Sequence, residues 1–147
     1  MKYSLKIKTL KRGWQDRDNL ILHSAFQCLV DFVEEEMFHE IASRTRSEDN
    51  PAEAAVYDEV LYLYNWWTQE RPARKDPLND KTIPRPTEKE RWEPQLDGSS
   101  LLLSVDPIKY PEYVNALKES RRLDDEWKDE DQRNLHRLID LRFYLWT

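Results

Sequence analysis

The stretch LILHSAFQCLVDFVEEEMFHEI, residues 20–41, decides the fold class, because its apolar side chains recur every three or four residues. The recurring positions are Leu22, Phe26, Leu29, Val33, Met37 and Ile41. This spacing places them on one face of an α-helix, and such a face has to be buried against other elements. We therefore predict a helix over residues 16–43. Asp16, Asp18 or Asn19 would cap its first turn.

A second helix is predicted over residues 51–69. The sequence NPAE at its start offers Asn50 as the cap, Pro51 at the first helical position and Glu53 three residues after the cap. The apolar run VLYLY that follows would also suit a strand, but the start signals favour a helix. Pro72 stops it, because proline lacks the N–H that would continue the helical hydrogen bonds.

The rest of the chain is predicted as one long loop and a C-terminal helical region. Residues 70–109 hold six of the eight prolines and show no periodicity, and a loop this long in a compact domain is usually functional or disordered. Trp92 lies in its middle, so we expect the loop to be held against the body. Residues 110–147 are predicted as helices. Within them the charged run ESRRLDDEWKDEDQR, residues 119–133, is either the exposed middle of one helix or the join between two.

Two short segments have a β-like pattern. Residues 1–14 include KYSLKIK, where apolar and polar side chains alternate, and residues 100–105 are SLLLSV. A lone strand needs a partner, so we predict that these two segments pair. Together the patterns predict a mostly α protein, a single-domain helical bundle over residues 1–147 with a long proline-rich loop and a small two-stranded ribbon.

The composition excludes several classes of protein. The single cysteine, Cys28, lies in an apolar run, so a disulfide framework is excluded and a reducing, cytoplasmic setting is expected. No apolar run approaches the roughly 18 residues that a membrane span needs, so no membrane partner is expected. The net charge of −6 argues against general nucleic-acid binding, which depends on neutralising phosphates.

The charges are unevenly distributed along the chain. Residues 1–17 carry six basic and one acidic side chain, residues 18–70 carry two basic and twelve acidic ones, and residues 71–91 carry seven basic and four acidic ones. The basic segments either pair with the acidic block, which we favour, or form a local anion-binding face.

One candidate site is a metal site. In EEEMFHE, Glu36, His39 and Glu40 share one helix face, and Glu-x-x-His is the unit that di-metal carboxylate bundles use. With Asp58 of the second helix they would hold Mg²⁺ or Mn²⁺ in a metal-dependent nucleotide hydrolase; no other cofactor is expected. The alternative, a solvent-exposed acidic helix end, is favoured because only one such unit is present. The two glycines leave no phosphate-binding loop, and there is no paired-cysteine zinc site.

A second candidate site lies in LYLYNWWTQERPARKDP. Two tryptophans and three cations follow one another there: Trp66, Trp67, Arg71, Arg74 and Lys75. Arginine forks hold phosphate or carboxylate groups and aromatic rings stack on bases, so the segment would bind an anionic, nucleotide-like ligand. The alternative, which we favour, puts Trp67 in the core and Trp66 under the long loop, with the arginines paired to acidic side chains.

The C-terminal region holds a third candidate. Its apolar stripe of Leu135, Leu138 and Leu145 continues to Asp131 and Arg142. Charged side chains on a core-facing stripe are unfavourable unless they are paired. They either belong to a buried structural network, which is favoured, or line a cavity.

Three segments resemble a family of small proteins encoded by tailed bacteriophages. They are RDNLILHSAFQCLVDFVEEE, LYLYNWWTQERPARKDP and DEDQRNLHRLIDLRFYLWT. The most specific pieces are Tyr-x-Trp-Trp followed by Arg-Pro-x-Arg-x-Asp-Pro, and the ending Arg-x-x-Leu-Trp-Thr. Asn134, where methionine is usual, and the pair Gln27–Cys28 depart from the family pattern. The similar segments contain the charged residues Arg71, Arg74, Asp76, Asp131, Arg137 and Arg142.

The resemblance implies an accessory protein that acts in the cytoplasm of an infected bacterial host, and it implies no activity. Our first hypothesis is a non-enzymatic protein that binds an anionic, nucleotide-like ligand or a host defence protein. The binding residues would be Trp66, Trp67, Arg71, Arg74, Lys75, Arg137 and Arg142. The alternatives are the metal-dependent nucleotide hydrolase, and a structural or assembly component of the virion that forms homo-oligomers.

Overall fold

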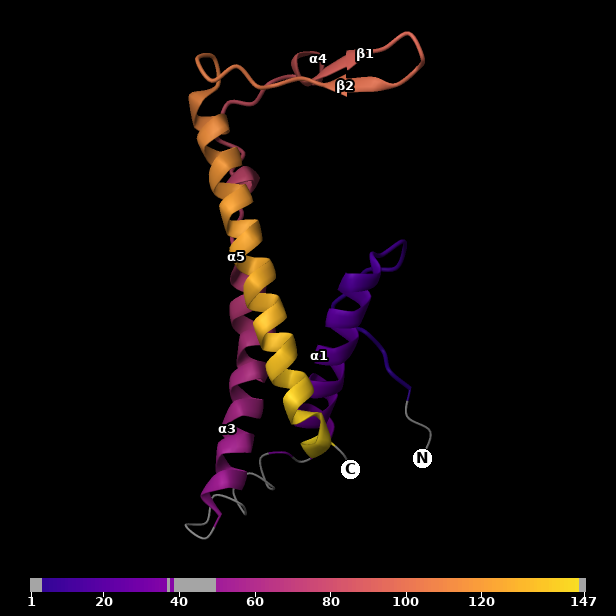
Figure 1. Ribbon diagram of the computed structural model, residues 1–147, viewed down its shortest axis with the longest axis vertical. Coiled ribbons are helices and arrows are strands. Elements are labelled where there is room, and N and C mark those ends of the chain that lie inside the picture. Colours follow the sequence, from indigo (N-terminus) through magenta and orange to yellow (C-terminus); the bar gives the residue numbers. More distant parts are fainter. Residues whose placement is uncertain (1–3, 37, 39–49, 146–147) are drawn as a thin grey trace. The chain divides into compact units, whose positions relative to one another are not determined.

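The protein is described by a computed structural model that covers residues 4–36, 38 and 50–145. Across these residues it has four α-helices and one two-stranded antiparallel sheet (Figure 1). The elements are α1 (Arg17–Glu35), α3 (Pro51–Asn65), α4 (Glu88–Arg91), β1 (Trp92–Pro94), β2 (Ser100–Leu102) and α5 (Pro111–Leu141). The predicted mostly α fold with a small ribbon is confirmed.

The chain divides into two compact units. The first unit is Met1–Arg74 with Asp129–Thr147, and the second unit is Lys75–Lys128. Helix α5 contributes to both, since it begins in the second unit and ends in the first. The single-domain organisation stays a prediction, because a compact unit is defined by its internal contacts and not by its ability to fold alone.

The core of the first unit lies among α1, α3 and the C-terminal end of α5. The helical face predicted for residues 20–41 is buried where the structure describes it, at Leu22, Phe26, Leu29 and Val33. Other core side chains come from Val60 and Leu63 of α3 and from Leu138 and Leu141 of α5. Helix α1 ends at Glu35, earlier than the predicted residue 43.

The second long helix begins as predicted. Asn50 is the cap, its side-chain oxygen accepts the N–H of Glu53, and Pro51 occupies the first turn. The α-helix ends at Asn65 and continues as a π-helix, Trp66–Glu70, and a 3₁₀ turn, Arg71–Ala73.

The π-helix explains why the residues after it face the core side. In an α-helix, Glu70 would follow both Trp66 and Trp67 by about one turn and would lie on their face of the helix. A π turn is one residue wider, so Arg71 takes that place, and its N–H bonds the carbonyl of Trp66. Both tryptophans are buried, at 0% and 3% exposure, so the prediction for Trp67 is confirmed while Trp66 lies in the core and not under the loop.

The N-terminal segment covers α1 instead of forming a strand. The described residues 4–16 contain no strand, and β2 pairs with β1, so the predicted pairing of residues 1–14 with residues 100–105 is wrong. The backbone N–H of Lys8 donates to Oε1 of Gln27, 2.9 Å away, which buries a second side of α1. Cys28 is exposed and does not lie on the core face.

The predicted long loop contains a short helix and a hairpin. Thr87 and Glu90 form a capping box that starts α4, and β1 follows directly. The hairpin turn is closed by the N–H of Gly98 donating to the carbonyl of Gln95. Gly98 has φ +84°, a left-handed conformation that glycine adopts without strain. Trp92 is 48% exposed on β1, so it does not hold the loop against a core.

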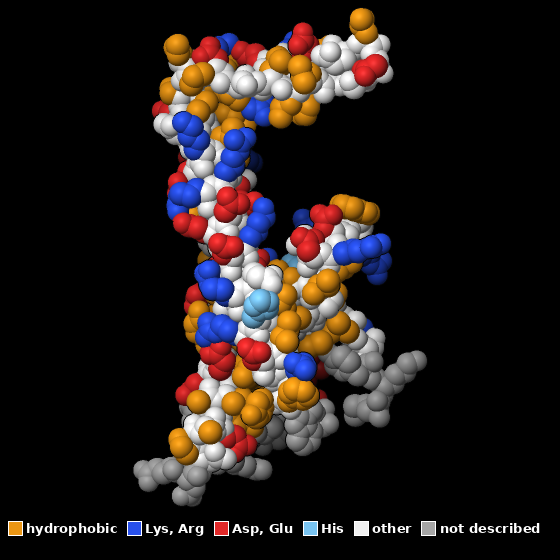
Figure 2. Space-filling model, in the orientation of Figure 1, with side chains coloured by type: hydrophobic (Ala, Val, Ile, Leu, Met, Phe, Trp, Pro, Cys, Tyr) orange, Lys and Arg blue, Asp and Glu red, His pale blue; other side chains and the backbone are white. Residues whose placement is uncertain are grey.

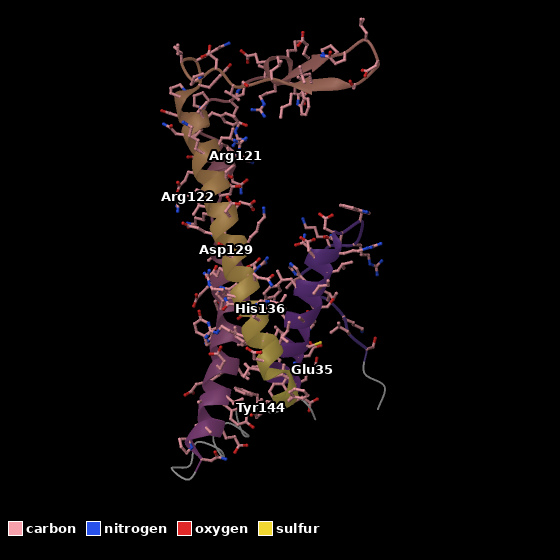
Figure 3. All side chains as sticks on the ribbon, in the orientation of Figure 1. Glu35, Arg121, Arg122, Asp129, His136 and Tyr144 are labelled. Carbon is pink, nitrogen blue, oxygen red and sulfur yellow. The ribbon has the colours of Figure 1, made fainter. Side chains whose placement is uncertain are left out.

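The charged run of residues 119–133 is the middle of one continuous helix, α5. Most of its charged side chains, among them Arg121, Arg122 and Asp129, are exposed (Figure 3). Arg122 pairs with Glu119 and Glu126 at helical spacing, which stabilises the helix without core contacts. None of the helices in the described ranges combines the length and the apolar run that crossing a membrane requires.

Candidate functional site

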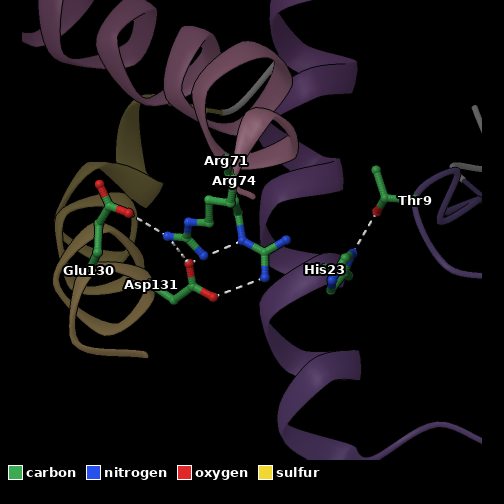
Figure 4. Close-up of polar contacts among 6 residues, drawn as sticks. All are labelled: Thr9, His23, Arg71, Arg74, Glu130 and Asp131. Carbon is green, nitrogen blue, oxygen red and sulfur yellow. Dashed lines mark hydrogen bonds and ion pairs between the residues drawn. The ribbon is translucent and has the colours of Figure 1, made fainter. Parts of the chain in front are cut away.

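Arg71 and Arg74 of the second candidate site meet Asp131 of the third in one ion-pair cluster of the first unit (Figure 4). Arg71 donates from Nε and Nη2 to the two carboxylate oxygens of Asp131, at 3.0 and 2.9 Å. Arg74 Nη2 lies 2.8 Å from the same carboxylate and also donates to Glu130. We call Arg71, Arg74, Glu130 and Asp131 the arginine cluster.

The tryptophans form the apolar side of this cluster. The guanidinium carbon of Arg71 lies 4.8 Å from the ring centroid of Trp67, and that of Arg74 lies 5.7 Å from the ring of Trp66. The side chains of Arg71, Arg74 and Asp131 are only 15 to 23% exposed. Each arginine therefore bonds a carboxylate and has an aromatic ring beside it, an arrangement that joins the end of the tryptophan segment to α5.

The charge of Asp131 is stabilised by this arrangement. Burial alone would raise the pKa of Asp131, but the hydrogen bonds and charges of Arg71 and Arg74 outweigh it and hold the pKa below its usual 3.8. The stabilisation by the cluster is therefore complete above that pH and is lost as the pH falls through the lowered pKa.

A polar ladder that the sequence analysis did not single out runs along α1. Its members His23, Gln27 and Asp31 are spaced by four residues and are all buried. Gln27 donates to Asp31 at 2.8 Å, and Thr9 Oγ1 lies 2.7 Å from Nδ1 of His23. Lys8 Nζ is 3.9 Å from Asp31. The spacing of these three polar residues inside an apolar stretch was the signal that a polar segment of the chain packs on this side.

His23 connects the ladder to the arginine cluster. Its ring meets that of Trp67 edge to face, with the centroids 4.9 Å apart. Burial lowers the pKa of His23 below 6.5, the charge of Arg71 lowers it further, and Asp131 opposes both. These surroundings therefore favour the neutral imidazole over the charged one.

We expect the stability of the protein to fall as the pH is lowered below 6.5, the ordinary pKa of His23. In that range the unfolded chain binds a proton at residue 23 before the folded chain does, so unfolding becomes more favourable by up to about 1.4 kcal/mol per pH unit. Urea denaturation at a series of pH values should show this slope in the wild type and a smaller one in His23→Gln. Equal slopes in the two proteins would contradict the assignment.

The remaining predicted binding residues lie elsewhere. Arg137 pairs with Glu59 of α3, donating from Nη2 at 2.7 Å, and its guanidinium lies 4.1 Å from the ring centroid of Tyr62. Arg142 is exposed in the 3₁₀ turn Arg142–Tyr144, where it lies over the ring of Phe143, so its predicted place in a buried network with Asp131 is wrong. Lys75 is exposed and belongs to the second unit.

The predicted metal ligands are only partly described. Glu36 follows the end of α1 and is exposed, and Asp58 is exposed on α3. His39 and Glu40 lie outside the described residues. In the part of the chain that the structure covers, no three His, Cys, Asp or Glu side chains converge as metal ligands would.

The chain matches no protein-family model, no curated protein and no solved structure.

Proposed function

We propose that this protein is a non-enzymatic interaction protein that binds another protein chain through the β1–β2 hairpin of its second unit. The observation that carries the proposal is the exposure of large apolar side chains on a small sheet. Trp92 is 48% exposed, Leu101 54% and Leu102 51%, and Leu96 at the hairpin turn is fully exposed. Hydrophobic side chains are exposed on this hairpin in the space-filling view, among polar and acidic ones (Figure 2).

Elementary energetics support a partner at this surface. A two-stranded hairpin alone is only marginally stable in water. Covering apolar surface is worth about 25 cal/mol per Å², so a partner that buries these side chains gains affinity and stabilises the hairpin at once. Large exposed apolar surfaces on otherwise charged proteins are typical of interaction sites.

The other hypotheses stay predictions. An anionic, nucleotide-like ligand at Arg71 and Arg74 would have to replace Asp131 on both guanidiniums, and so it competes with an existing charge pair. A metal-dependent hydrolase would need the acidic residues around Glu36. The resemblance to phage proteins supports an accessory role in the cytoplasm of an infected host, with a host or viral protein as the partner.

Site-specific photo-crosslinking tests the proposal. We replace Leu101 with benzoylphenylalanine, express the full chain in bacterial cells and irradiate them. We expect a discrete crosslinked product, identified by mass spectrometry. The matched control carries the same residue at Asp125, an exposed position on α5 in the same unit, and should give none. Absence of any adduct at Leu101, or equal adducts at both positions, would contradict a hairpin interaction.

A further inference from the structure

The two edges of the hairpin differ in their capacity to pair. The backbone N–H of Leu103 donates to the carbonyl oxygen of Arg91 at 2.7 Å. The backbone N–H of Gln95 donates to the carbonyl oxygen of Ser99 at 2.8 Å. In an antiparallel pair, such hydrogen-bonded positions alternate with positions whose N–H and C=O point outward. The outward-facing positions are therefore Trp92 and Pro94 on β1 and Ser100 and Leu102 on β2.

Proline blocks one of these edges. Pro94 has no N–H, so the outer edge of β1 lacks a donor where an added strand would need one. The outer edge of β2 keeps both groups at Ser100 and Leu102. The described sheet has two strands, so this β2 edge has no partner strand within the described residues. An unprotected edge is a template for another strand.

The sequence centred on Leu102, at the end of β2, is complementary to itself. Residues 98–105, GSSLLLSV, carry no charge, so two copies side by side do not repel each other. The central five residues, SLLLS, are identical read in either direction. Over these five residues, an antiparallel pair centred on Leu102 places serine opposite serine and leucine opposite leucine. Self-complementarity of this kind is what a two-fold interface requires.

We propose that the partner is a second copy of this chain, which adds its β2 edge antiparallel to the β2 edge of the first. This inference rests on the proposed function of the hairpin. Leu102 and its counterpart exchange reciprocal N–H to C=O hydrogen bonds at the two-fold axis. The two hairpins then form one four-stranded sheet. A sheet of three or more strands with an apolar face can be stable by itself.

The register of the hairpin makes this pairing favourable for the side chains. Trp92 lies opposite Leu102, so the two share one face of the sheet. In the paired sheet, Trp92 and Leu102 of each copy form a continuous row of four apolar side chains across that face. Cross-strand apolar neighbours of this kind stabilise sheets, and the row covers surface that is half exposed in the single chain.

Introducing a positive or a negative charge at Leu102 tests the proposal on the full chain. The wild type should be a dimer by sedimentation equilibrium. Leu102→Lys and Leu102→Glu should each raise the dimer Kd by about tenfold or more, because each puts like charges side by side at the axis. An equimolar mixture of the two variants should restore the dimer, because opposite charges then meet. The control, Leu96→Lys, adds the same charge at the hairpin turn, away from the edge, and should leave the Kd unchanged.

Each outcome decides between the possibilities. A wild type that is monomeric at all concentrations, or a Leu102→Lys variant that dimerises like the wild type, overturns self-pairing. If a monomeric wild type still crosslinks from Leu101 to a different protein, the proposed function stands and only the second copy is wrong. If it crosslinks to nothing, both fail. A mixture of charge variants that stays monomeric while the wild type dimerises overturns the Leu102-centred register.

Discussion

Asp131→Asn is expected to lower the free energy of unfolding by about 3 kcal/mol, because it leaves two mostly buried guanidiniums without their shared counter-charge. Arg71 and Arg74 both bond the carboxylate of Asp131 in the wild type. Asparagine keeps the size of the side chain but brings no charge, so the two cations repel each other, and Arg74 keeps its bond to Glu130. For a chain of this length the melting temperature should fall by roughly 10 °C. Thermal unfolding followed by circular dichroism measures the change.

Two further variants separate this structural role from ligand binding. Asp129→Asn makes the same chemical change at an exposed position on α5 and should alter stability by less than about 0.5 kcal/mol. Arg71→Ala should destabilise the protein as well, because it removes a bidentate pair and the contact with Trp67. If Asp131→Asn and Arg71→Ala both leave the melting temperature unchanged, the cluster has no structural role, and the prediction that Arg71 binds an anionic ligand gains weight.

The sequence predicted the helical part of the fold because its signals are local. The apolar period around Phe26 and the cap at Asn50 each depend on residues within a few turns of one another, and both were confirmed. The predicted strand pairing was wrong because β2 pairs with the neighbouring strand β1 across a tight turn and not with residues 1–14. The turn QLDG before residue 99 did carry a hairpin signal, with glycine in the left-handed position. Pro94 obscured it, because proline reads as a break unless the strand is known to be an edge.

The arginine cluster was predicted in pieces. The sequence pointed to Arg71 and to Asp131 separately, and it favoured ion pairs over an open pocket. It did not predict that these two residues bond each other. Sixty positions separate them. The one-residue shift that aims Arg71 inward comes from the π turn, which no propensity signals. The ladder at His23 was missed for a related reason, since its burial depends on the N-terminal segment folding back over α1.

Trp66→Ala is expected to cost about 4 kcal/mol, in the range for deleting a buried aromatic side chain. Trp66 has 0% exposure, and its ring packs against Phe26 and Trp67 with centroids 5.3 and 6.0 Å away. The truncation leaves a cavity in the core of the first unit and also removes the ring beside Arg74. Urea denaturation should show the loss as a lower midpoint. Trp14→Ala, at a position 84% exposed, is the matched control and should change stability by less than about 0.5 kcal/mol.

Trp66→Phe gives the sharper test, because the buried indole N–H of Trp66 has no hydrogen-bond partner among the residues that the structure describes. A buried donor without an acceptor costs about 1–3 kcal/mol. Phenylalanine keeps much of the ring and removes that donor, so the gain offsets part of the lost packing and the net cost should stay below about 1.5 kcal/mol. A Trp66→Phe variant as unstable as Trp66→Ala would mean that the N–H does contribute a hydrogen bond. A small cost would show that losing the unpaired donor offsets part of the packing lost with the larger ring.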